Sequence, residues 1–330
     1  MTDQPARSPA AAAETTAGGR PVVLTAARLW PKMMEALHGA FEVHDRTHQS
    51  DPTAFAALAP RVRAIAASGE SKVTRELIAQ LPALEVISVF GVGYDGVDVA
   101  AARERGIAVT HTPNVLNDEV ADLAIALMLA VSRRLVEADR FVRAGQWKNG
   151  PMPLARKVSG TRLGIVGLGR IGQAIATRAE AFGMSVAYTS RNARPGVAYR
   201  YYPSAEALAA EVEFLVVITP GGAGTRKLID ARVLAALGSK GYLINVARGS
   251  VVDEQALVAA LLNGTIAGAG LDVFEDEPNV PEALFALDNV VLVPHIGSAT
   301  VQTRQAMADL AFANLEAHFA GKPLLSPVPA

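Results

Sequence analysis

The chain of 330 residues contains no cysteine. This absence excludes a disulfide framework, catalysis by a thiol and a metal site with cysteine ligands, and it fits a reducing cytoplasm, where we expect the protein to reside. A strong charge of one sign is also absent. The formal net charge is −1, which gives no reason to expect nucleic acid or an anionic membrane as a partner. No apolar run reaches the roughly 18 residues that a membrane-spanning helix needs.

The composition is that of an ordinary globular protein, with 50% hydrophobic and 19% charged residues. A chain of this length exceeds one comfortable core, so two domains are expected. Residues 1–20 are rich in Ala, Pro, Thr and Gly and lack the apolar core of a secretory signal. We predict that they form a disordered tail. The alternative, a short transit peptide, is disfavoured by Asp3 and Glu14.

From Pro21 onward, short apolar runs alternate with helical patterns, which is typical of an α/β fold. In the first section the predicted strands are 22–25, 62–66, 86–89 and 107–109, and the predicted helices are 32–37, 74–80 and 97–105. A long apolar helix follows, starting at Asn117 or Asp118, and a second one runs to about Ala144.

A more regular series begins at Arg162. It contains six predicted strands, at 163–166, 185–189, 214–218, 241–246, 267–271 and 290–293. Helical segments separate the first five, which predicts a doubly wound parallel sheet with right-handed crossovers. The last helix, about 300–319, comes after this sheet is complete, so we expect it to return to the first section. The predicted domains are therefore 113–296 and a discontinuous one made of 21–112 and 297–330.

A glycine-rich loop lies directly between the strand 163–166 and a helix. Gly167 permits the tight turn, Gly169 lets the backbone approach a pyrophosphate, and Gly172 lets helix and strand pack closely. The helix N-terminus then faces the phosphate charge. The alternative is a plain glycine turn. The context favours a Rossmann dinucleotide-binding domain, inserted in a smaller flavodoxin-like α/β domain. The cofactor contacts predicted here are Gly167, Leu168, Gly169, Arg170, Ile171 and Gly172.

The residues after the second strand of this series discriminate between the two dinucleotides. An NAD enzyme places Asp or Glu there to bind the ribose 2′-hydroxyl. Here the chain reads Ser190-Arg191-Asn192, with no carboxylate before Glu206. Arg191 can form charge-assisted bonds with a 2′-phosphate, and its neighbours can donate to it. NADP is therefore the preferred cofactor and NAD the second choice; the alternative is that Arg191 is a solvated loop charge.

Three polar residues follow three successive strands. Arg248, Glu277 and His295 come just after the fourth, fifth and sixth strands of the series. The carboxyl ends of parallel strands meet at one edge of the sheet, where ligands bind, so these residues are expected to converge.

Reduction of a 2-keto acid needs these residue types. A guanidinium binds the carboxylate with two parallel bonds, an imidazolium supplies a proton, and a carboxylate keeps that imidazole oriented and charged. Taken singly, each residue has a structural alternative. Arg248 can cap a helix or pair with Asp253, Glu277 can belong to a solvated acidic loop, and His295 can be a core histidine.

On these residues the chain resembles the D-isomer-specific 2-hydroxyacid dehydrogenase family, from about Pro21 to Pro329. The most specific matches are GLGRIG at 167–172, NVARGSVVDE at 245–254, GLDVFEDEP at 270–278 and PHIGSAT at 294–300. Within the family it looks most like the NADPH-dependent glyoxylate/hydroxypyruvate reductases and the hydroxyphenylpyruvate reductases, through Ser190-Arg191 and the ending GKPLLSPV at 321–328.

The resemblance implies hydride transfer from NADPH to a small 2-keto acid, such as glyoxylate, hydroxypyruvate or an aryl pyruvate, to give the D-2-hydroxy acid. It implies Arg248 as the substrate-binding residue, His295 as the proton donor and Glu277 as its partner. No metal is implied. The further contacts it implies are Val92 and Gly93 for the substrate carboxylate, Val246 and Asp272 for the nicotinamide carboxamide, and Thr219, Pro220 and Gly297 for the rest of the cofactor. For Val92 and Gly93 the alternative is an ordinary strand–helix turn.

The resemblance also implies a homodimer, in which the helix 121–131 forms the dimer face and residues 145–154 reach toward the partner. One segment departs from the family pattern: residues 220–225 read PGGAGT, where the family usually has a bulkier Pro-Leu-Thr-Pro-Glu-Thr-like run. Two alternative functions use the same scaffold. One is a phosphoglycerate-type or formate dehydrogenase, and the other is a dinucleotide-sensing corepressor-like binding protein.

Overall fold

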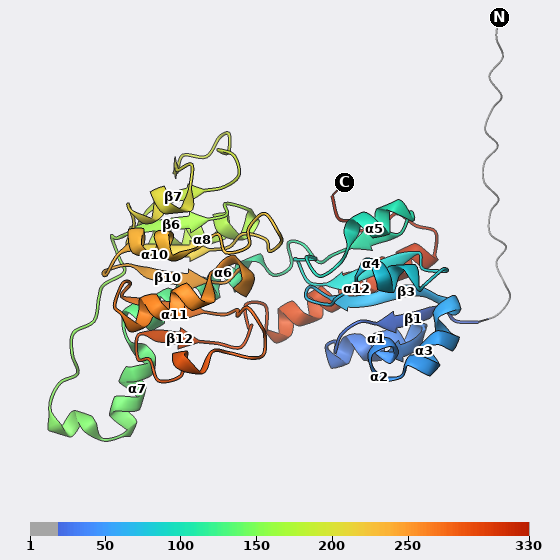
Figure 1. Ribbon diagram of the computed structural model, residues 1–330, viewed down its shortest axis with the longest axis horizontal. Helices are drawn as coiled ribbons and strands as arrows, with labels where there is room; N and C mark the ends of the chain where they lie inside the picture. Colours follow the sequence, from blue (N-terminus) through green and yellow to red (C-terminus); the bar gives the residue numbers. More distant parts are fainter. Residues whose placement is uncertain (1–18, 330) are drawn as a thin grey trace, which may run out of the picture.

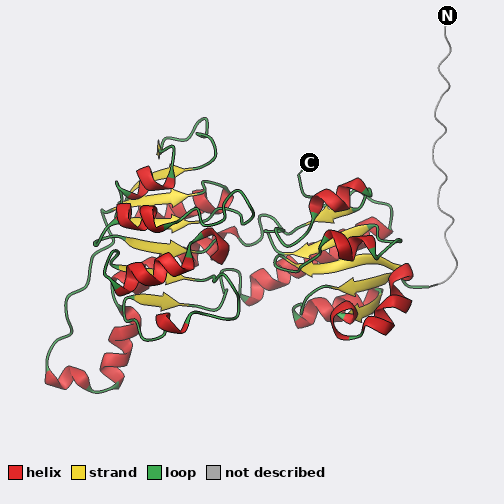
Figure 2. Ribbon diagram, in the orientation of Figure 1, coloured by secondary structure: helices red, strands yellow, loops and turns green. Residues whose placement is uncertain are grey.

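The computed structural model describes residues 19–329, so nearly all of the predicted tail lies outside the described residues. Two parallel sheets with helices on their faces form two lobes (Figure 1, Figure 2). This arrangement confirms the predicted α/β class with two domains. Within residues 19–329, no helix combines the length and the apolar character that a membrane span requires.

The smaller sheet has five strands in the order β2-β1-β3-β4-β5. They are β1 (Val22–Thr25), β2 (Glu42–Asp45), β3 (Val62–Ser68), β4 (Val86–Phe90) and β5 (Ala108–Thr110). Four of them were predicted, within two residues at each end. The strand β2 was missed because it lies at the sheet edge, carries charged residues at both ends and has no fully buried residue. The helices of this section are α1 (Pro31–Ala40), α2 (Thr47–Ser50), α3 (Pro52–Leu58), α4 (Arg75–Ala79) and α5 (Val99–Glu104).

The larger sheet has seven strands in the order β12-β11-β10-β9-β6-β7-β8. Its strands are β6 (Arg162–Val166), β7 (Ser185–Thr189), β8 (Arg200–Tyr201), β9 (Phe214–Val217), β10 (Tyr242–Asn245), β11 (Gly268–Leu271) and β12 (Val290–Leu292). Only the two-residue edge strand β8 was not predicted. The chain order reverses between β6 and β9, and this switch point is where a dinucleotide binds in such sheets.

Helices cover both faces of the larger sheet (Figure 2). The crossover helices are α8 (Arg170–Ala181), α9 (Ala205–Ala209), α10 (Ala231–Leu237) and α11 (Glu254–Leu262). The long helix α6 (Asn117–Ser132) also packs on this sheet, whereas α7 (Leu135–Arg143) projects from it as an arm (Figure 1). Because the central strands are covered on both sides, β9 is buried at every residue.

The last helix, α12 (Val301–Phe319), leaves the larger lobe and runs into the smaller one (Figure 1). It packs on α1 and β4. The Oγ atom of Ser88 in β4 donates a hydrogen bond of 2.8 Å to the carbonyl of Ala311. The ring of Phe41 lies 5.9 Å from that of Phe312. The smaller domain is therefore built from both ends of the described chain.

Candidate active site

The glycine-rich loop has the geometry of a phosphate-binding turn. Gly167 has a φ of +103°, and a Cβ atom there would lie 2.7 Å from the carbonyl oxygen of Ile218. At Gly172 a Cβ atom would lie 2.3 Å from the carbonyl oxygen of Gly167. Both positions therefore exclude a side chain. At Gly169, by contrast, a Cβ atom would meet nothing within 4 Å. This open side of the N-terminus of α8 fits a dinucleotide pyrophosphate.

The loop after β7 is polar and cationic. The Oγ atom of Ser190 donates a hydrogen bond of 2.6 Å to the carbonyl of Asn192, and Arg191 is exposed. A further arginine in this loop, Arg194, donates a hydrogen bond to the carbonyl of Leu168 in the glycine-rich loop. Arg194 was not predicted from the sequence, although it follows Arg191 by only three residues. The two cations and the lack of a nearby carboxylate suit a phosphorylated ribose.

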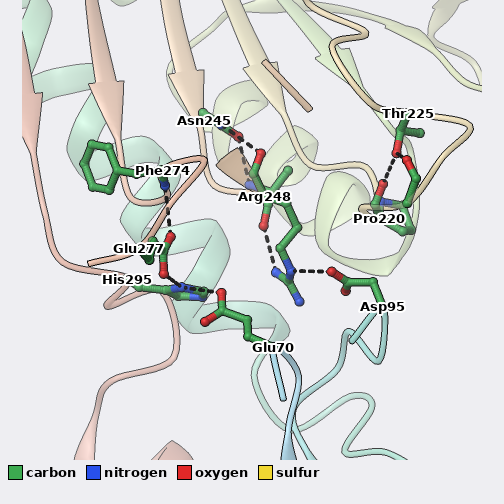
Figure 3. Close-up of polar contacts among 11 residues, drawn as sticks. Glu70, Asp95, Pro220, Thr225, Asn245, Arg248, Phe274, Glu277 and His295 are labelled. Carbon is green, nitrogen blue, oxygen red and sulfur yellow. Dashed lines mark hydrogen bonds and ion pairs between the residues drawn. The ribbon is translucent and has the colours of Figure 1, made fainter. Parts of the chain in front are cut away.

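The three strand-end residues converge at one edge of the larger sheet (Figure 3). The Nδ1 atom of His295 lies 2.7 Å from Oε2 of Glu277, whose other oxygen accepts a bond of 2.9 Å from the backbone N–H of Phe274. Glu277 is thus fixed by two partners and is half-buried, although its neighbours in the loop are exposed. Arg248 donates to the carbonyl of Ala247 at 2.8 Å.

Arg248 pairs with the smaller domain. Its Nε atom lies 3.3 Å from Oδ2 of Asp95. The alternative considered from the sequence, an ion pair between Arg248 and Asp253, is wrong. Asp253 instead contacts Lys227 at 3.2 Å. A Cβ atom on Gly93 would lie 2.0 Å from Nη2 of Arg248, so the loop of Val92 and Gly93 is directly against the guanidinium.

The electrostatics of His295 favour the imidazolium. Burial by itself would lower its pKa, but the hydrogen bond to Glu277 and the contact with Glu70 outweigh burial and raise the pKa to about 9. Glu70 comes from the smaller domain, and its Oε1 atom lies 3.1 Å from the same Nδ1 atom. His295 is therefore an imidazolium at neutral pH.

The backbone of His295 is held in an uncommon conformation. Its φ of +51° is left-handed, which is rare for a residue other than glycine and is concentrated at functional sites. Asp272 stabilises this turn. Its carbonyl accepts from the N–H of His295 at 2.9 Å, and its side chain accepts from the N–H groups of Ile296 at 2.6 Å and Gly297 at 2.9 Å. Burial raises the pKa of Asp272.

The other predicted cofactor residues border the same edge. Val246 is buried and continues β10. Thr219 lies against Gly167, since a Cβ atom on Gly167 would be 3.0 Å from the Cα atom of Thr219. The departing segment 220–225 forms a closed turn, in which the Oγ1 atom of Thr225 donates to the carbonyl of Pro220 at 2.7 Å (Figure 3).

Glu70 and Asp95 were not anticipated from the sequence. Both follow strands of the smaller sheet, Glu70 after β3 and Asp95 after β4. The strand-end rule that found Arg248 and His295 in the larger sheet would have found them if it had been applied to the smaller one.

Comparison with known proteins places this geometry in one family. The model of the D-isomer specific 2-hydroxyacid dehydrogenase NAD-binding domain matches residues 125–297. The chain is 55% identical to the glyoxylate/hydroxypyruvate reductase A of Arabidopsis thaliana over 267 residues, which cover 81% of this chain and 85% of the relative. It is 47% identical to the 2-ketogluconate reductase of Gluconobacter oxydans, over 94% of this chain and 99% of that one.

The fold is shared with solved structures. The NADPH-dependent glyoxylate/hydroxypyruvate reductase of Sinorhizobium meliloti, in complex with NADP and malonate, aligns with a TM-score of 0.89. It is 50% identical, and the match covers 94% of this chain and 97% of that one. Sequence and structure agree in their assignment, and the chain belongs to the D-isomer specific 2-hydroxyacid dehydrogenases.

Proposed function

We propose that the protein reduces small 2-keto acids to D-2-hydroxy acids with NADPH, with glyoxylate and hydroxypyruvate as the first candidates and aryl pyruvates as the next. The observation that carries this proposal is the convergence of Arg248, Glu277 and His295 at the sheet edge beside the phosphate loop. The relatives in Arabidopsis thaliana and Sinorhizobium meliloti support it, since both are named as glyoxylate/hydroxypyruvate reductases.

Each residue has one task in the proposed reaction. Arg248 and the backbone N–H groups of Val92 and Gly93 bind the substrate carboxylate, and Arg248 polarises the carbonyl. NADPH, when bound, supplies the hydride that reduces the carbonyl carbon. His295 gives a proton to the carbonyl oxygen from Nε2, because its Nδ1 atom is engaged by Glu277.

The remaining contacts serve the cofactor. Residues 167–172 bind the pyrophosphate, and Thr219, Pro220 and Gly297 contact the rest of the cofactor. The carbonyl of Val246 and the carboxylate of Asp272 hold the nicotinamide carboxamide, since each Asp272 oxygen keeps a lone pair besides the one used by a backbone N–H.

A turnover assay tests the function directly. NADPH oxidation is followed with glyoxylate, hydroxypyruvate, pyruvate and an aryl pyruvate, and the product is resolved by chiral chromatography. We expect turnover with at least one of these acids and a D product. Failure of every acid with both NADPH and NADH would contradict the proposal and favour a dinucleotide-binding role without turnover.

Cofactor choice is tested by Arg191→Asp. The change removes a charge-assisted bond to the 2′-phosphate and adds a repelling carboxylate, so NADPH binding should weaken by roughly 1.5–3 kcal/mol or more. Binding of NADH should change much less. Both dissociation constants are measured by titrating cofactor fluorescence.

The matched control is Arg232→Asp, the same charge reversal at the exposed start of α10. It should leave both constants unchanged. A wild-type protein with higher kcat/KM for NADH than for NADPH would contradict the assignment of Ser190, Arg191 and Asn192 to the 2′-phosphate.

We also propose a cytoplasmic homodimer. The projecting arm carries exposed apolar side chains on α7 and beyond it, including Leu135, Val142, Trp147 and Leu154. Trp147 is 69% exposed and Leu154 is 97% exposed, which is unfavourable in water unless a partner covers them. A second copy, with α6 in the interface, would do so. The absence of cysteine supports the location. We further propose that the domains meet at 112/113 and 296/297, in the loops after β5 and before α12.

Trp147→Glu should therefore shift the dimer toward monomer, by about 2 kcal/mol or more if the indole is a central contact. Sedimentation velocity over a range of concentrations measures the shift. Leu262→Glu is the control, because Leu262 is 58% exposed on α11, outside the arm. A monomeric wild-type protein would overturn the dimer.

A further inference from the structure

The segment 69–71 of the smaller domain is packed against the loop that contains Val92, Gly93 and Gly96. The carbonyl of Gly69 accepts a bond of 3.2 Å from the N–H of Gly96, and the Oγ atom of Ser71 accepts one of 2.8 Å from the N–H of Ser68. A Cβ atom on Gly69 would lie 2.7 Å from the carbonyl oxygen of Gly93. The backbone at Glu70 is therefore fixed, and its side chain has a defined origin at the end of β3.

From this position Glu70 reaches across to the larger domain (Figure 3). Its Oε1 atom lies 3.1 Å from Nδ1 of His295, while Oε2 of Glu277 lies 2.7 Å from the same nitrogen. A single N–H can point well at only one oxygen. Because Glu277 receives that hydrogen bond, Glu70 acts on His295 mainly through its charge.

The other charged groups around His295 do not cancel this attraction. Asp272, which accepts from the N–H groups of Ile296 and Gly297, attracts the imidazolium electrostatically. Arg248 pairs with Asp95 at 3.3 Å, and its charge helps to lower the pKa of Glu70, which keeps that carboxyl ionised. The guanidinium of Arg304 in α12 lies over the ring of Phe90, 5.6 Å from its centroid. Two carboxylates, one from each domain, therefore contact the same Nδ1 atom of the imidazolium.

We propose that Glu70 is a positioning residue that binds the protonated His295 across the contact between the two domains and thereby couples domain closure to proton uptake by the catalytic histidine. This inference rests on the proposed function. Closure brings a second carboxylate to Nδ1, so the closed form binds the proton more tightly, and by linkage the proton stabilises the closed form.

The reaction would then weaken the contact between Glu70 and His295. As the hydride adds to the carbonyl carbon and the dinucleotide is oxidised, the proton on Nε2 of His295 passes to the carbonyl oxygen. The imidazole becomes neutral and loses its attraction to Glu70. Proton transfer therefore favours opening of the two domains and release of the hydroxy acid. Protonation of His295 from solvent restores its contact with Glu70 for the next turnover.

Glu70→Gln tests the charge while keeping the shape. In the wild type, the rate of reduction should fall as pH rises through the pKa of His295. In the variant, this falling limb of kcat/KM should move to lower pH by about one unit. Glu277→Gln should move it at least as far. The matched control is Glu76→Gln, which removes the same charge from exposed α4 of the same domain and should leave the profile in place.

A second measurement needs no turnover. The imidazole C–H resonances of the six histidines are titrated by NMR, with His295 assigned by its loss in His295→Ala. In the complex with NADPH and oxamate, an unreactive analogue of a 2-keto acid, Glu70→Gln should lower the pKa of His295, and hydrogen-exchange protection of residues 90–95 should decrease.

Equal pKa values of His295 in Glu70→Gln and Glu76→Gln, with equal hydrogen-exchange protection of residues 90–95, would overturn the proposed role of Glu70. That result would leave the proposed function intact if the wild type reduces keto acids. A wild type without turnover, whose His295 resonance still shifts in Glu70→Gln, would contradict the proposed function and support the contact itself.

Discussion

Replacing His295 by alanine should lower kcat/KM for the reduction of a 2-keto acid by about 10²–10⁴-fold, the usual contribution of a positioned proton donor. The loss should be similar at every pH, because the variant has no group at that position to titrate. NADPH binding should persist, since the phosphate loop lies on a different part of the sheet edge. Steady-state rates and a cofactor titration measure the two effects.

The direction in which the rate of the wild-type enzyme changes with pH follows from the pKa of His295. Because the pKa of His295 is raised to about 9, the imidazolium required for reduction is present at neutral pH and is lost as pH rises through that value. Oxidation of the hydroxy acid needs the neutral imidazole and should improve over the same interval. His38→Ala, on the exposed side of α1, is the control. A His295→Ala enzyme that kept the wild-type rate would remove His295 from the mechanism.

Arg248→Ala should have a comparable effect through the other half of the site. Two parallel charge-assisted bonds to the substrate carboxylate are lost, at roughly 1.5–3 kcal/mol each, or about 10²–10⁴-fold in kcat/KM. Asp95 also loses its partner at 3.3 Å and adds a carboxylate that repels the substrate. The measurement is kcat and KM with glyoxylate or hydroxypyruvate.

Arg248→Lys separates charge from geometry. The ammonium keeps the positive charge but cannot form the planar fork, so it should restore only part of the loss. Arg248→Ala/Asp95→Asn removes the repelling carboxylate and should recover part of it as well. If Arg248→Ala retained most of the wild-type kcat/KM, the carboxylate of the substrate would have to bind elsewhere.

Much of the fold could be predicted from local pattern. Strands such as β9 (Phe214–Val217), buried on both faces, are continuous apolar runs and were found. The edge strands β2 (Glu42–Asp45) and β8 (Arg200–Tyr201) were not, because they are mostly polar and a half-solvated strand needs no apolar run, whereas the more apolar edge strands β5 and β12 were found. The short helices α2 and α3 were missed for the same reason, since few of their residues are buried.

Strand-end pattern predicted the site residues of the larger domain, whereas in the smaller domain only Val92 and Gly93 were named, through the family resemblance. Arg248, Glu277 and His295 each follow a strand of one sheet, so a rule about strand ends brings them together. Glu70 and Asp95 contact them only because the smaller domain lies against the larger one. Their contacts depend on how two domains sit against each other, which no local pattern records. Arg194 was missed because its bond to Leu168 depends on the path of the loop after β7.

The place of α12 in the smaller domain has a consequence for synthesis. The ribosome completes β5 long before it reaches Val301, and residues 111–300 take roughly 10–40 s at about 5–20 residues per second. During that interval the larger domain can fold, while Met33, Leu37 and Phe41, which are buried in the finished protein in the same core as α12, still lack that helix. The domain that begins first is thus the last to be finished, and in the meantime its apolar surface is open to chaperones.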